Sequence, residues 1–137
     1  MTETKPGLVK LSDSELILKD QAQDVRGLHV YDSNGEQVGG VADLYVDEQE
    51  CEVRLLDVAA GGFLGLGEKH FLIPVETVTE VGEGSLTVDP DRQKVVDSPP
   101  FDTSVVPRER YLRDIYEYYG HPPRGRGAGP RTWPPRI

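Results

Sequence analysis

The sequence has little of the material from which catalytic and metal-binding sites are usually built. It contains one cysteine, Cys51, and three histidines among its 137 residues. A single cysteine excludes an intramolecular disulfide and any metal site that needs several cysteines, and it fits a reducing compartment such as the cytoplasm. The histidines (His29, His70 and His121) lack metal-ligand spacing, and no serine lies in a Gly-x-Ser-x-Gly elbow. We therefore expect no catalytic residue, no cofactor and no bound metal.

Long apolar runs are also absent. Nowhere do about 18 consecutive apolar residues occur, as a membrane-spanning helix requires, and the first seven residues contain no apolar signal core. We expect a soluble, cytoplasmic protein without stable membrane insertion. Its length leaves room for one domain plus appendages.

Basic residues are scarce through most of the chain. Residues 1–107 hold 8 Lys and Arg against 21 Asp and Glu, a net charge of −13, whereas residues 108–137 hold 7 against 3. A body this acidic repels phosphate backbones. Nucleic-acid binding is therefore expected only from the basic C-terminal end.

What the chain does contain, from residue 28 to residue 89, is a series of short apolar runs separated by Gly, Asn, Asp and Pro. This pattern predicts consecutive strands and turns, and Asn34-Gly35 predicts a hairpin. We expect five or six strands in an antiparallel meander. Closing such a sheet into a small barrel removes its exposed edges, so the predicted fold class is an all-β barrel.

Alternation along the strands predicts which side chains face the core. In the strand from residue 37 to 46, Ala42, Leu44 and Val46 share the predicted core face. Asp43, Tyr45 and Asp47 share the face that we expect to be wet. The whole predicted core comprises Val30, Val38, Leu44, Val46, Val53, Leu55, Phe71, Ile73, Val78, Leu86 and Val88.

The segments flanking the barrel are less uniform. Residues 8–19 fit either a short helix capped by Ser12 or Ser14, or a strand at residues 16–18. Residues 90–96 predict one helical turn, ended by Pro99-Pro100. A C-terminal amphipathic helix that ends at Gly120 is indicated by the spacing of Leu112, Ile115, Tyr116 and Tyr119.

Two loop motifs look functional but depart from their patterns. Residues 61–69 have glycines at phosphate-loop spacing, but Glu68 replaces the required lysine and Lys69 the required Ser or Thr. Asp32, Asn34 and Glu36 resemble half a calcium loop that lacks its glycine. Both are interpreted as turns. A solvated turn is favoured over a weak cation site or docking face for the acidic cluster of Asp43, Asp47, Glu48, Glu50 and Glu52.

The tail at residues 121–137 is rich in Pro, Gly and Arg and contains no acid. Such a composition buries too little apolar surface to offset the entropy of ordering, so we expect a disordered tail that folding does not need. Its arginines and Trp133 could contact RNA, acidic lipid, an acidic protein or the acidic body of the chain itself. We expect such a contact to be salt-sensitive.

Several segments together resemble the PRC-barrel family, which is named after the cytoplasmic domain of the photosynthetic reaction-centre H subunit and occurs also in ribosome maturation factors. The similarity covers about residues 24–102. It is carried by Asp24-Val25-Arg26-Gly27, residues 30–39, residues 41–47, residues 61–67, Phe71-Leu72-Ile73-Pro74-Val75 and Pro99-Pro100-Phe101-Asp102. Leu11-Ser12-Asp13 and Tyr118-Tyr119-Gly120 are similar to the prefix and suffix of stand-alone bacterial members.

The resemblance implies an antiparallel barrel of about six strands at 24–102, which leaves an extension at 1–23, a helix at 103–120 and the tail at 121–137 outside it. It implies no catalytic residue, because family members act as docking or assembly modules. We therefore expect a protein partner, or a second copy in a homodimer. Support of electron transfer, as by the H subunit, and RNA or ribosome association are the alternatives. The predicted partner contacts are Phe63, Leu64, Leu66, Tyr116, Tyr119, Arg124 and Arg126.

Overall fold

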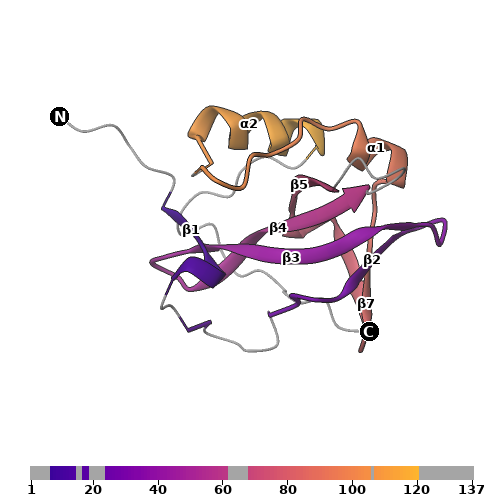
Figure 1. Cartoon of the computed structure of the whole chain (residues 1–137), viewed down its shortest axis with the longest axis horizontal. Coiled ribbons are helices and arrows are strands. Elements are labelled where there is room, and N and C mark those ends of the chain that lie inside the picture. Colours follow the sequence, from indigo (N-terminus) through magenta and orange to yellow (C-terminus); the bar gives the residue numbers. More distant parts are fainter. Residues whose placement is uncertain (1–6, 15–16, 19–23, 62–67, 106, 121–137) are drawn as a thin grey trace.

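The computed structural model describes residues 7–14, 17–18, 24–61, 68–105 and 107–120. This part of the chain is mostly β, with two short α-helices, which confirms the predicted fold class. The elements of Figure 1 are β1 (Leu8–Lys10), η1 (Leu11–Asp13), β2 (His29–Asp32), β3 (Gln37–Asp47), β4 (Glu52–Gly61), β5 (Glu68–Pro74), η4 (Val75–Thr77), β6 (Val78–Val81), β7 (Ser85–Val88), α1 (Arg92–Val96) and α2 (Glu109–Tyr118).

The hairpin between β2 and β3 forms where the Asn-Gly pair predicted it. Gly35 has a φ of +84°, a conformation that glycine adopts at little cost, and its N–H donates to the Asp32 carbonyl oxygen at 3.0 Å. The Asp32 carboxylate accepts hydrogen bonds from the backbone N–H groups of Asn34 and Glu36, both at 2.9 Å. Local chemistry therefore fixes this turn and the register of the strands on either side.

The strands form one curled sheet in the order β5-β4-β3-β2-β7-β6, with β1 added at the edge of β3. Neighbouring strands are antiparallel except β2 and β7, which run parallel, so the predicted antiparallel meander is wrong for this pair. The chain turns at η4 from β5 into β6, and the β6–β7 hairpin returns beside β2. Among the described residues the pairing ends at β5 and β6, so the sheet is a half-barrel rather than a closed ring.

A bulge in β3 overturns part of the predicted facing. The register against β4 shifts between Val41 and Asp43, so Val41 is buried and Ala42 is exposed. One extra residue moves later side chains to the opposite face, because strand side chains alternate with period two. The face expected to be wet is also covered, since Asp43 contacts η1 through Ser12, while Tyr45 packs on Phe101.

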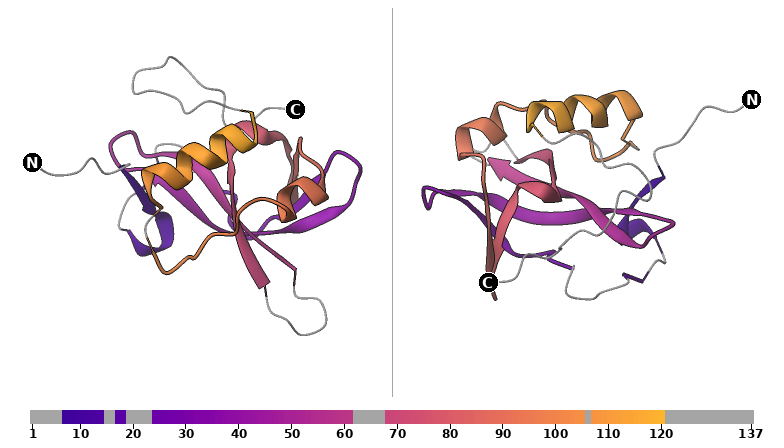
Figure 2. Two further views of the ribbon diagram at one scale, coloured as in Figure 1. Left: turned by 90° about the horizontal axis from the view of Figure 1, so that it is seen from above. Right: turned by 180° about the vertical axis from the view of Figure 1, so that it is seen from behind.

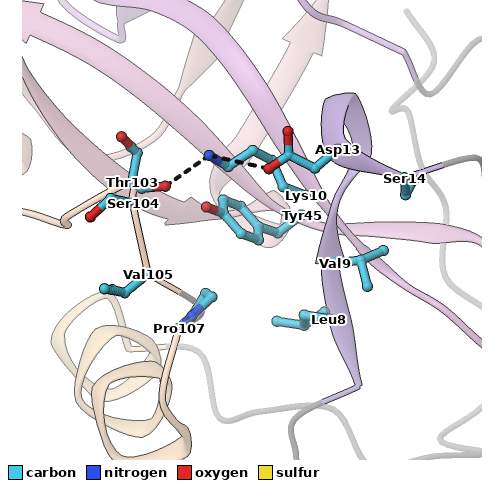
Figure 3. Close-up of a pocket in the computed structure, with 10 residues that line it drawn as sticks. All are labelled: Leu8, Val9, Lys10, Asp13, Ser14, Tyr45, Thr103, Ser104, Val105 and Pro107. Carbon is cyan, nitrogen blue, oxygen red and sulfur yellow. Dashed lines mark hydrogen bonds and ion pairs between the residues drawn. The ribbon is translucent and has the colours of Figure 1, made fainter.

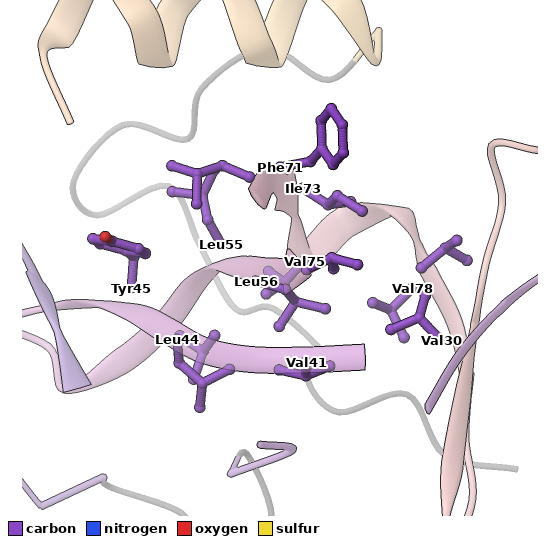
Figure 4. Close-up of a cluster of buried hydrophobic side chains, with 14 of the residues drawn as sticks. Val30, Val41, Leu44, Tyr45, Leu55, Leu56, Phe71, Ile73, Val75 and Val78 are labelled. Atoms are coloured by element: carbon purple, nitrogen blue, oxygen red, sulfur yellow. The ribbon is translucent and has the colours of Figure 1, made fainter. Parts of the chain in front are cut away.

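All eleven side chains predicted for the core are buried. The buried side chains as a whole, with Val41 and Tyr45 added to the predicted ones, lie on both sides of the central strands (Figure 4): Val41 and Leu44 lie on one side, whereas Tyr45 and Leu55 point toward α2. The core therefore has one layer inside the curled sheet and a second layer between the outer face of the sheet and the C-terminal helix.

The predicted C-terminal helix is confirmed as α2, which lies across the outer face of the sheet (Figure 2). The helix ends at Tyr118 with Tyr119 as its C-cap, and Gly120 follows with a φ of +76°, which suits a glycine just after a helix. The side chains that α2 and its C-cap bury are the predicted set, Leu112, Ile115, Tyr116 and Tyr119. The short helix at residues 90–96 is also confirmed, as α1.

The N-terminal segment, for which the sequence left a helix or a strand open, contains one of each at other positions: a strand at residues 8–10 and a one-turn helix whose N-cap is Lys10 rather than Ser12 or Ser14. β1 pairs with residues 45–47 of β3, and the one-turn helix η1 follows it directly. Leu11 of η1 is buried in the core. The start of the described chain is therefore attached to the barrel by both backbone pairing and packing.

Candidate functional site

A pocket of about 260 Å³ lies between β1, η1, β3 and the segment that leads into α2 (Figure 3). This volume is below the range of about 300–1,000 Å³ typical of pockets that enclose a drug-sized ligand. The pocket therefore suits one bulky side chain better than a whole cofactor. The apolar part of its lining comes from Leu8, Val9, Tyr45, Val105 and Pro107, and the polar part from Lys10, Asp13, Ser14, Thr103 and Ser104.

Lys10 connects the two walls of the pocket. Its Nζ donates a hydrogen bond to the Thr103 carbonyl oxygen at 2.8 Å and lies 3.8 Å from the Asp13 carboxylate. The Lys10 side chain is 20% exposed, whereas that of Asp13 is 75% exposed. The Lys10 ammonium group therefore binds groups of the protein itself, while the Asp13 carboxylate at the rim of the pocket faces solvent.

Tyr45 marks the place where the pocket meets the core. Its hydroxyl is buried and has no hydrogen-bond partner in the described part of the chain, and in Figure 3 it points toward the side of Thr103. Burial raises the pKa of Tyr45, and the carboxylates of Asp57, Asp43 and Asp13 raise it further. The phenol therefore stays neutral.

Two carboxylates lie buried next to each other on the outer face of the sheet. Asp43 is directly opposite Asp57 in the β3–β4 register. Asp43 accepts hydrogen bonds from the backbone N–H and the hydroxyl of Ser12, whereas Asp57 lies 2.7 Å from Nδ1 of His70. Burial raises the pKa of Asp57, although the hydrogen bond and charge of His70 act in the opposite direction.

The acidic turn between β3 and β4 is built around an arginine. Arg54 pairs with Glu50 and lies 3.8 Å from the Asp47 carboxylate and 3.9 Å from that of Glu52. Arg54 thus fills the centre that a cation would occupy, as expected for a turn. In the described ranges no group of three His, Cys, Asp or Glu side chains is placed to hold a metal ion.

A comparison with protein families matches residues 19–95, more than half of the chain, to the PRC-barrel domain. The chain belongs to the PRC-barrel family. No curated protein matches the sequence. None of the helices that the structure describes is long and apolar enough to cross a membrane.

The PRC-barrel match does not include most of the pocket. Of the lining residues only Tyr45 lies within residues 19–95, while β1 and residues 103–107 lie outside them. Domains of this family are generally non-catalytic modules. The pocket is therefore a feature that this chain adds to its PRC barrel through its flanking segments.

The structure places only two of the seven predicted partner contacts. Tyr116 and Tyr119 are each 7% exposed and pack in the core beneath α2, which leaves them little surface for a partner. The other five lie outside the described residues and stay predictions: Phe63, Leu64, Leu66, Arg124 and Arg126.

Sequence reasoning missed the pocket. The alternation of side chains predicts a wet face for Tyr45, although its apolar neighbours Leu44 and Val46 indicate a strand buried on both sides. Lys10 and Thr103 are 93 positions apart, and no local pattern reports so distant a contact.

Proposed function

We propose that this PRC-barrel protein is a non-enzymatic docking module that binds a protein partner in the cytoplasm. The observation that carries the proposal is its charge, 21 acidic against 8 basic residues over positions 1–107. Such a field attracts a partner with a basic surface and speeds their association. The general role of the family as a non-catalytic module supports the same function.

This module must bind its partner through its surface, because side chains fill the interior of the curled sheet. Leu44, Leu56 and Ile73 inside the curled sheet have no exposed area, and α2 covers the outer face. The contacts that we propose are the loop residues Phe63, Leu64 and Leu66, together with the tail residues Arg124 and Arg126, which would meet acidic groups of the partner outside its basic surface. Tyr116 and Tyr119 are left out because they belong to the core.

Affinity capture from native lysate with the full tagged chain tests this function. We expect one or a few proteins at stoichiometric yield, with less recovered in 1 M salt than in 0.1 M salt, because the Debye length falls from about 10 to about 3 Å. A chain with Phe63, Leu64 and Leu66 all replaced by serine should retain less partner. The matched control is Ile17→Ser, which also removes an exposed apolar side chain but lies outside the loop.

Other outcomes of the capture would redirect the proposal. Recovery of ribosomes would favour the maturation role, and recovery of pigment–protein complexes would favour support of electron transfer. Light scattering of the purified chain shows whether the partner is a second copy. Failure to retain any protein at either salt concentration would contradict docking.

A further inference from the structure

The pocket beside Val105 has room for one bulky apolar side chain, and the chain carries one that the described core does not use. Trp133 is the only tryptophan in the sequence and lies between Arg131 and Arg136 in a segment without acids. We propose that Trp133 binds in this pocket of its own chain, so that residues 131–136 dock on the barrel.

The first argument is apolar surface. Val105, at the mouth of the pocket, is 52% exposed and is one of two large apolar side chains that are exposed in the described ranges. Leu8, Pro107 and the ring of Tyr45 continue the same apolar surface into the pocket. An indole inserted here covers all four, and aromatic side chains bury about 150–250 Å² each.

The second argument is charge. Asp13, at the rim, has a side chain that is 75% exposed, whereas Lys10, the one cation among the lining residues, is held by Thr103 and Asp13. Arg131 lies two residues before Trp133 and can reach the rim when the indole is inside. The arginines of the docking segment thus meet a body with a net charge of −13 over residues 1–107.

The third argument is reach. Pro107 lines the pocket and α2 begins two residues later, so its ten residues carry the chain about 15 Å away at 1.5 Å per residue. Trp133 lies thirteen positions after Gly120, and an extended chain of that length spans up to about 43 Å. The segment is therefore longer than the distance that it must span to bring Trp133 back to the pocket of its own chain. A tether of this kind gives an effective concentration in the millimolar range, which favours its own chain over a second copy.

Tryptophan fluorescence of the full chain tests the proposal directly, because Trp133 is the only indole. We expect emission shifted to the blue of a free peptide with the sequence of residues 121–137, and weaker quenching by acrylamide. Val105→Glu should shift the emission to that of the free peptide. Ile17→Glu is the matched control, since Ile17 is 75% exposed but does not line the pocket, and it should change neither measurement.

Two further measurements guard the interpretation. Circular dichroism shows whether the Val105→Glu variant folds. In the second measurement, a Trp133→Ala chain is titrated with the free peptide. The peptide should bind this chain, and adding Val105→Glu to the same chain should abolish the binding. Emission of the wild type equal to that of the free peptide overturns the proposal. So does a blue shift that grows with protein concentration, which would indicate a second copy, or an equal response to Val105→Glu and Ile17→Glu.

Discussion

Asp32 shows how one buried carboxylate can organise residues far apart in the sequence. Its side chain accepts hydrogen bonds from the backbone N–H groups of Asn34 and Glu36 at 2.9 Å, and from that of Arg92 at 2.8 Å. Burial alone would raise its pKa, but the backbone donors stabilise the charged form more, so the pKa of Asp32 is lowered from 3.8. The carboxylate therefore joins the β2–β3 turn to the start of α1.

We predict that Asp32→Ala lowers the free energy of unfolding by about 2 kcal/mol or more at neutral pH, since three part-buried N–H groups lose a charged acceptor and a hydrogen bond to a charged group contributes about 1.5–3 kcal/mol. Because the folded pKa lies below the unfolded one, this contribution is present above pH 3.8 and is lost as the pH falls through the folded pKa. Urea unfolding at neutral and acidic pH should show that the difference in free energy of unfolding between the wild type and Asp32→Ala becomes smaller in acid. Asp32→Asn, which keeps a hydrogen-bond acceptor but not the charge, is the control. A stability difference between the wild type and Asp32→Ala that does not change with pH would contradict the prediction.

Asp57 should have the opposite pH dependence. Its pKa is raised by burial, so above pH 3.8 the unfolded chain loses this proton before the folded chain does, and the contribution of Asp57 to stability falls as the pH rises. Asp57→Asn removes the ionisation and leaves an oxygen beside Nδ1 of His70. We predict that the stability of this variant relative to wild type increases from pH 3.5 to pH 7, measured by denaturant titration. A relative stability that decreases over this interval would mean that His70 outweighs burial.

At the scale of elements, two adjacent glycines in β3 have different roles. A Cβ atom on Gly39 would lie 2.2 Å from the Ala59 carbonyl oxygen of β4, whereas one on Gly40 would lie 3.7 Å from the nearest atom, the Leu28 carbonyl oxygen. Backbone cannot move aside as a flexible side chain can. Only Gly39 is therefore required by the close approach of β3 and β4.

We predict that Gly39→Ala destabilises the protein by about 1–3 kcal/mol or more, the usual cost of forcing extra atoms into a packed interior. Gly40→Ala is the matched control in the same strand and should cost less. Thermal unfolding followed by circular dichroism compares the two. Equal midpoints for both variants would show that β3 and β4 separate at this point without cost.

The same elements show what sequence can and cannot predict. The β2–β3 hairpin and α2 depend on local signals, Asn34-Gly35 and a repeat of apolar residues, and both were predicted. The bulge at Ala42 and the parallel β2–β7 pair depend on how distant strands meet, and no local signal reports that. The pocket depends on the contact of Lys10 with Thr103, which lie 93 positions apart. The residues that line it can be read in the sequence, but that they meet cannot be predicted from it.

At the scale of the whole molecule, the PRC barrel depends on residues outside the family match. Phe101 donates its backbone N–H to the His70 carbonyl oxygen of β5 at 2.8 Å and packs its ring on Tyr45. Ile115 of α2 is fully buried. Residues 101–105 and 107–119 are therefore part of the folded unit, although the match ends at residue 95.

Where the folded unit ends can be tested by removing the tail. The described core reaches Tyr119, and residues 121–137 contain five prolines, three glycines and four arginines without an acid. We predict that deleting them lowers the thermal midpoint only slightly, because a composition of this kind adds little to a core and the docked Trp133 is the one large apolar contact that the deletion removes. The part of this difference that comes from the arginines should shrink between 0.1 and 1 M salt, as the Debye length falls from about 10 to about 3 Å. Ile115→Ala, by contrast, should lower the free energy of unfolding by about 2–5 kcal/mol. If the truncated chain were as unstable as that variant, residues 121–137 would belong to the core.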